Sequence, residues 1–117
     1  MSNADENRRF VLAFFKIISG RKKDPTELRI YVADEKLVET LCALESYLPA
    51  YRISIEEVTS EGKKVSLKAI AHGHTSQLVP GREYAEIPFA LSCRVEKGKI
   101  TDHWFIADQL AFLKQFQ

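Results

Sequence analysis

The spacing of apolar residues changes once along this chain, near Tyr51, and that change decides the fold class. Before Tyr51, apolar residues recur every three or four positions, which is the spacing of amphipathic helices. After Tyr51 they recur every second position, which is the spacing of strands with one buried face. Helices followed by hairpin-connected strands predict an α+β domain, in which a strongly curved, mainly antiparallel sheet wraps around packed helices.

Three helices are predicted in the first half of the chain. The first covers residues 9–19. Asp24 and Pro25 provide an N-cap and a first-turn proline for a second, short helix. The third carries its apolar face through residues 37–48, and Pro49 ends it.

Four strands and a closing helix are predicted in the second half. The strands cover residues 52–59, 65–74, 83–96 and 100–106. Pro88 predicts that the third of them is an edge strand or contains a bulge. The closing amphipathic helix presents Leu110, Ala111, Leu113 and Phe116 on one face.

Length and charge narrow the class of protein. The chain has 117 residues, 45% of them hydrophobic, which predicts one domain over residues 1–117 with a substantial core. A net charge of +1 gives no general attraction to nucleic acid or to a membrane surface, and we expect neither as a partner. Without an apolar leader or a bilayer-length apolar run, we expect a cytoplasmic protein.

Two smaller groups of residues have structural interpretations. The run Arg21-Lys22-Lys23 is short and flanked by Gly20 and Asp24, which predicts a solvated loop. The two cysteines, Cys42 and Cys93, have no His or Cys at metal-ligand spacing, so we expect small core residues in a reducing compartment.

Asp108 is the leading candidate for chemistry. It stands where the last strand becomes the closing helix, and uninterrupted alternation places it on one strand face with Trp104 and Ile106. A carboxylate held in an apolar pocket has a raised pKa and can transfer protons near neutral pH. An Asp at this position also serves as a helix N-cap, and the sequence leaves both roles open.

The three histidines are the other titratable candidates. His103 lies on the strand face opposite Trp104, either as a catalytic group or as a half-buried histidine bonded to backbone or solvent. His72 and His74 share a strand face, but no third ligand stands on that strand. We therefore expect a polar pocket wall or a solvent-facing pair, and no metal site.

The sequence resembles the SnoaL-like polyketide cyclases of the nuclear-transport-factor-2-like superfamily. The segment EKGKITDHW, residues 96–104, is similar to the family pattern dGKIvEhW and is followed by Asp108. Residues 31–34, 48–51 and 53–57 are similar to the helical half and the first long strand of the family. The family's GTHTG segment appears as HGHTS, residues 72–76, and the loop after it is shortened.

The resemblance implies a cone that encloses one pocket and often dimerises through the outer surface of its sheet. It implies that Asp108 is the acid–base group of an aldol ring closure, without a metal or an organic cofactor. We expect a compact, apolar carbonyl compound as substrate, with His74 or His103 stabilising the oxyanion. The expected substrate-binding residues are Trp104, His72, Tyr31, Phe89, Ile106 and Asp34.

Two alternatives accompany this hypothesis. The altered histidine segment and the shortened loop are compatible with a non-catalytic ligand-binding or dimeric association module of the same fold. The other alternative is that the chain's own Phe and Leu side chains fill the cavity, in which case no ligand would bind.

Overall fold

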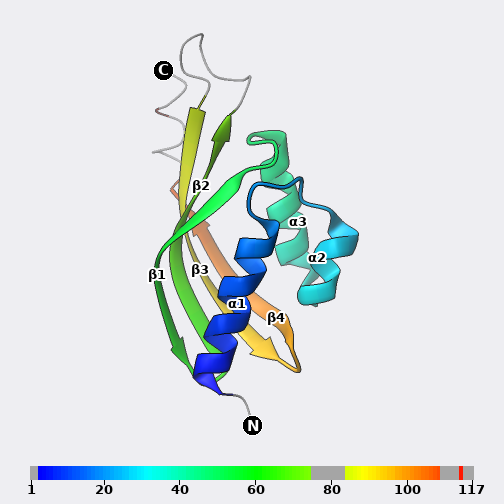
Figure 1. Cartoon of the computed structure of the whole chain (residues 1–117), viewed down its shortest axis with the longest axis vertical. Helices are drawn as coiled ribbons and strands as arrows, with labels where there is room; N and C mark the ends of the chain where they lie inside the picture. The colour runs from blue at the N-terminus through cyan, green and yellow to red at the C-terminus, as the bar shows by residue number, and fades with distance from the viewer. Residues whose placement is uncertain (1–2, 75–83, 109–113, 115–117) are drawn as a thin grey trace.

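Helices cover one face of an antiparallel sheet in the computed structural model, which describes residues 3–74, 84–108 and 114 (Figure 1). The described helices are α1 (Ala4–Ile18), α2 (Pro25–Tyr31), α3 (Glu35–Ala43) and the 3-10 helix η1 (Leu44–Ser46). The strands lie in the order β1-β2-β3-β4 and cover Arg52–Glu61, Lys64–His74, Tyr84–Glu96 and Lys99–Ala107. None of the described helices combines the length and the apolar character needed to cross a bilayer.

Local hydrogen bonds explain where the helices begin. The Asn3 side chain accepts the backbone N–H of Asp5 at 2.8 Å, so α1 begins five residues before the predicted start. The predicted cap of α2 is confirmed, because Asp24 accepts the N–H of Thr26 at 3.2 Å. Asp34 caps α3 by accepting the N–H of Lys36 at 3.0 Å.

The third helix is shorter than predicted. It ends at Ala43, and η1 continues the chain with the tighter bond from the N–H of Tyr47 to the carbonyl of Leu44, at 3.1 Å. The predicted closing helix, with Leu110, Ala111, Leu113 and Phe116, lies outside the described residues, as does the shortened loop before Tyr84.

Irregular pairing at two places bends the sheet. The register between β1 and β2 shifts between Ile55 and Glu57. Between β3 and β4, Arg94 pairs with Asp102 but Val95 pairs with Ile100, so Thr101 is an extra residue. Bulges of this kind increase local twist and curvature, which gives the strands the bend that Figure 1 shows around the helices.

The position of Pro88 contradicts the prediction of an edge strand or a bulge. It lies in β3, which is an interior strand, and its register with Ile70 on β2 is continuous. Its carbonyl accepts the N–H of Asp108 at 2.8 Å, so its missing N–H also faces the end of β4. The proline is therefore tolerated because the β3–β4 pairing stops there.

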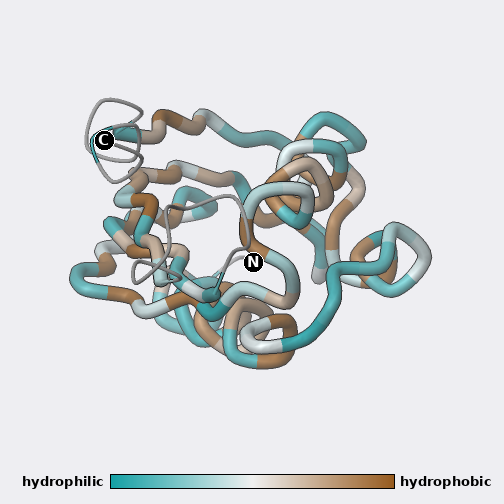
Figure 2. Tube along the Cα trace, turned by 90° about the horizontal axis from the view of Figure 1, so that it is seen from above, coloured by the Kyte–Doolittle hydropathy of each residue, from teal (hydrophilic) through white to brown (hydrophobic). Residues whose placement is uncertain are grey.

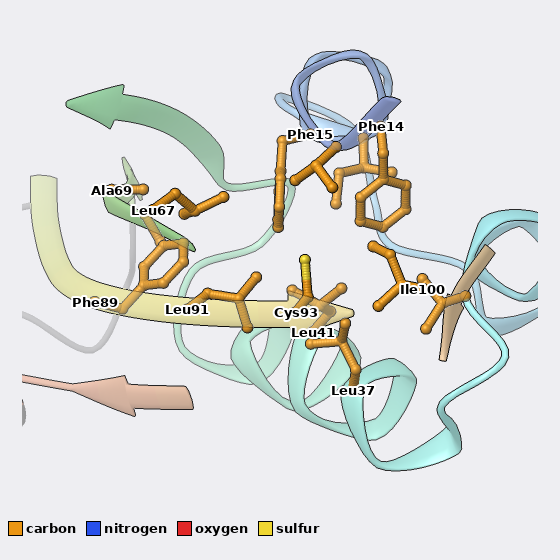
Figure 3. Close-up of a cluster of buried hydrophobic side chains, with 14 of the residues drawn as sticks. Phe14, Phe15, Leu37, Leu41, Leu67, Ala69, Phe89, Leu91, Cys93 and Ile100 are labelled. Atoms are coloured by element: carbon orange, nitrogen blue, oxygen red, sulfur yellow. The ribbon is translucent and has the colours of Figure 1, made fainter. Parts of the chain in front are cut away.

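The core fills the space between the helices and the inner face of the sheet. Figure 3 shows side chains of α1 and α3 meeting those of β3, with the Cys93 sulfur near the centre. Viewed from above, hydrophobic and hydrophilic residues alternate along the strands, as the two-residue period predicts (Figure 2). The central side chains are at most 2% exposed: Phe14, Phe15, Leu37, Leu41, Leu91 and Cys93.

Lys23 contradicts the prediction of a solvated loop. Its side chain is buried, and its ammonium donates to the carbonyl of Tyr51 at 2.9 Å and to the carbonyl of Arg21. It also pairs with Glu45 at 3.4 Å and lies 3.8 Å from the centre of the Tyr51 ring. Burial lowers the pKa of Lys23, and Glu45 partly offsets that shift.

Candidate functional site

The extra residue on β4 determines which of its side chains face the core. Uninterrupted alternation would place Ile100 on one face with Trp104 and Ile106. Because Thr101 is bulged, Ile100 is buried while Trp104 and Ile106 are 59% and 55% exposed. His103 pairs with Cys93 and therefore lies on the inner face.

His103 and Asp34 form the most buried polar pair of the predicted site. The Nδ1 atom of His103 lies 2.5 Å from Oδ2 of Asp34, and each side chain is only 12% exposed. The pair brings together two candidates that are 69 positions apart in the sequence. A bond from Nδ1–H to the carboxylate fixes one tautomer of the imidazole, in which Nε2 is free to accept a proton.

Backbone bonds hold Asp34 in place. The N–H groups of Ala33 and Asp34 both donate to the carbonyl of Ile100, at 2.8 and 3.2 Å. Asp34 also caps α3 through its other carboxylate oxygen, so both oxygens are used. The same residue thus joins α3 to β4 and orients the imidazole, which is the arrangement of a preorganised acid–base group.

Two of the expected substrate-binding residues, Tyr31 and Phe89, contact other aromatic rings. Tyr31, at the end of α2, contacts the ring of Phe14 with 5.6 Å between centroids, and the ring of Phe10 at 6.5 Å. Phe89 contacts Phe105, two residues after His103 on the same face, at 5.3 Å. Both Tyr31 and Phe89 are therefore part of the aromatic packing.

Asp108 lies apart from the pair. It is exposed, like Trp104 and Ile106, and its N–H donates to the Pro88 carbonyl. It lines an open cleft of about 560 Å³ with Ile106 and Phe89. The predicted grouping of Asp108 with Trp104 holds, but on the outer face of the sheet, and not against the interior. The helix that Asp108 was predicted to cap lies outside the described residues.

His72 and His74 also lie on the outer face. His72 bonds Ser54 on β1 through Nε2 at 2.8 Å and Tyr84 on β3 through Nδ1. The exposed His74 contacts the ring of Tyr84 at 5.5 Å. Within the described residues, no group of three His, Cys, Asp or Glu side chains is arranged to hold a metal ion.

The three predicted catalytic residues are therefore not assembled into one site. Pro88, whose carbonyl accepts the N–H of Asp108, pairs with Ile70 on β2. His74 lies four residues further along β2, about 13 Å from Ile70. His103 is on the opposite face from both.

Sequence reasoning missed Ser54 and Tyr84, the two partners of His72. Each contributes a hydroxyl from a neighbouring strand, so only the register of the sheet reveals the contact. The register between β2 and β3 could not be read from the sequence, because nine residues separate these strands and no two-residue turn signature sets their pairing.

Comparison with known proteins identifies the fold. No protein-family model matches the chain, and no curated protein matches it. Among solved structures, a "putative polyketide cyclase" from Acidithiobacillus ferrooxidans has a TM-score of 0.77 at 15% identity, covering 99% of this chain and 97% of that one.

Two further structures have the same architecture. IdmH from Streptomyces antibioticus, described in the same words, has a TM-score of 0.74 at 17% identity and covers 94% of this chain and 97% of its own. A SnoaL-like polyketide cyclase from Agrobacterium tumefaciens has a TM-score of 0.71 at 14% identity, and each chain is covered over 100% of its length. The predicted α+β fold is confirmed: the chain has the nuclear-transport-factor-2-like fold of the SnoaL-like polyketide cyclases.

Proposed function

We propose that this chain is a cyclase-like protein that binds a compact, apolar carbonyl compound and transfers a proton with His103. The observation that carries the proposal is the 2.5 Å contact between His103 and Asp34 at 12% exposure of each side chain. The fold shared with SnoaL-like polyketide cyclases supports a reaction of the aldol or isomerase type. Fold alone does not determine the reaction, so the pair is the decisive feature.

The chemistry follows from the two ring nitrogens. Nε2 of His103 takes a proton from the carbon next to a carbonyl, which leaves an enolate, and Asp34 stabilises the imidazolium that forms. The imidazolium then returns the proton to carbon or to the oxygen formed in ring closure. Phe105 and Ala107, which follow His103 on the inner face, are half-buried and pack against the apolar core.

Asp108 remains the acid–base residue that the family resemblance implies. Asp108 is exposed and lines the cleft on the outer face, whereas His103 is half-buried on the inner face. The two assignments predict different variants to be inactive, so one experiment separates them.

The first prediction uses 2-tetralone, whose hydrogens next to the carbonyl exchange with deuterium when a base removes them. We expect the protein to accelerate this exchange in D₂O, as measured by proton NMR. His103→Gln and Asp34→Asn should each lower the catalysed rate at least ten-fold, since general acid–base catalysis contributes roughly 10²–10⁴-fold. Asn retains the helix cap, so Asp34→Asn tests the acid–base pair with little effect on α3.

The matched control is His74→Gln, which removes an exposed imidazole from the outer face. It should leave exchange unchanged. If Asp108→Asn abolishes exchange and His103→Gln does not, the chemistry belongs to the outer cleft and the proposal is wrong.

A second candidate function is association through the sheet, and one observation favours it. Trp104 and Ile106 are large apolar side chains that are more than half exposed on the outer face. We propose that this face forms a homodimer interface, either alongside binding of a small molecule or as the main role of the protein.

A further inference from the structure

A cleft between α1 and β1 lies at the sheet edge opposite β4, and the proposed function does not use it. It has a volume of about 540 Å³, within the range of roughly 300–1,000 Å³ that small-molecule sites occupy. Its apolar lining comes from Leu12 and Phe15 on α1 and from Ile53 and Ile55 on β1.

The charged side chains that line this cleft are both cationic. They are Lys16, in the last turn of α1, and Arg52, at the start of β1. Within the described part of the chain neither forms an ion pair, whereas nearby Arg21 pairs with Glu27 at 2.7 Å. Among the residues that the structure describes, no carboxylate lines the cleft, and none there offsets its positive charge.

The backbone adds a hydrogen-bond donor at the same edge. The N–H of Ile53 points away from β2 and donates to the Ser19 hydroxyl at 2.9 Å. Because backbone direction alternates along a strand, the N–H of Ile55 points to the same open side. An oxygen of a bound anion could accept from this group while its tail lies against Leu12.

We propose that the α1–β1 cleft binds a small carboxylate with an aliphatic tail. Such a ligand places its tail against the apolar lining and its charge beside Lys16 and Arg52. The carbonyl end of α1 carries a partial negative charge of about half an elementary charge, which repels an anion. Lys16 and Arg52 together supply two full positive charges, which outweigh it. The balance therefore favours a carboxylate over a neutral or cationic head group.

The test uses octanoate, 1-octanol and octylammonium as probes of the intact chain, followed by amide NMR shifts. Octanoate should shift the amides of Ile55 and Gly20. Octanoate should bind about five-fold more tightly than octanol, because exposed charge pairs contribute a difference in affinity of about this size. Octylammonium should bind most weakly. Raising the salt concentration should reduce the preference for octanoate.

The variants separate charge from apolar contact. The double substitution Lys16→Gln and Arg52→Gln should abolish the preference for octanoate over octanol, whereas Lys22→Gln, an exposed lysine outside the cleft, should retain it. All three positions are exposed, so folding should be unaffected, as circular dichroism can verify. Equal binding of octanol and octanoate, shifts confined to other surfaces, or an unchanged preference in the double variant would each overturn the proposal.

Discussion

At the scale of single residues, burial determines how the titratable groups behave. Cys93 is 2% exposed among apolar side chains, and this burial raises the pKa of its thiol to about 12. Cys42 was predicted to be buried but is only half-buried, with its thiol 4.0 Å from the Lys23 carbonyl. Burial is also the main cause that raises the pKa of Cys42.

The thiolate is the reactive form of cysteine, so we predict that Cys93 is inert in the folded protein. With a pKa of about 12, roughly one thiol in ten thousand is ionised at pH 8. In a Cys42→Ser variant, Ellman's reagent at pH 8 should label Cys93 only after guanidinium is added. Rapid labelling of the native variant would show that the core opens easily, which would contradict this packing.

Lys23 shows why sequence reasoning failed at one position of a basic run. Arg21 and Lys22 are exposed as predicted, but Lys23 finds two backbone carbonyls and Glu45 within reach. Glu45 is 22 positions away and the Tyr51 carbonyl is 28. No local pattern reports partners at such separations, so charge density alone predicted exposure.

At the scale of elements, the sequence predicted the helices and strands well because their signals are local. Asp24 and Pro25 mark the start of α2, and the two-residue period marks β2 and β3. The extra Thr101 in β4 was not predicted, since a bulge leaves the composition of a strand unchanged. That one residue moved Trp104 from the predicted pocket wall to the outer face.

The turn between β3 and β4 allows a stability prediction. Lys97 and Gly98 have φ angles of 51° and 73°, the left-handed pair of a type I′ turn, in which Asn-Gly is preferred. Lys97→Asn should therefore raise the free energy of unfolding by about 0.5–1 kcal/mol, measured by urea denaturation. Lys97→Ala is the control, and equal stability of the two variants would contradict the explanation.

At the scale of the whole molecule, we propose that the outer face of the sheet is the surface for association. The proposed dimer predicts that Trp104→Glu yields a monomer by light scattering with unchanged circular dichroism. Ile30→Glu is a matched control, because Ile30 on α2 is 60% exposed and Trp104 is 59% exposed. A wild-type monomer at high concentration, or a dimer that persists in Trp104→Glu, would exclude this interface.

The candidate site was harder to predict than the fold. His103 and Asp34 were both named from the sequence, but in separate roles, since their contact requires the α2–α3 turn to bond to Ile100. Asp108 and His74 were assigned to one pocket because the resemblance treats the motifs as a set. Their positions in this chain depend on the bulge and on the sheet register, which short motifs do not encode.

Pro88 also affects how copies of this protein can aggregate through the edge of the sheet. Beyond Pro88, β3 continues for four residues to Tyr84, with no described strand beside it on the β4 side. A strand edge of this kind is a template for intermolecular pairing, the first step toward aggregates. Because Pro88 has no N–H and its carbonyl already accepts the N–H of Asp108, an added strand could not extend its pairing along β3 past this residue.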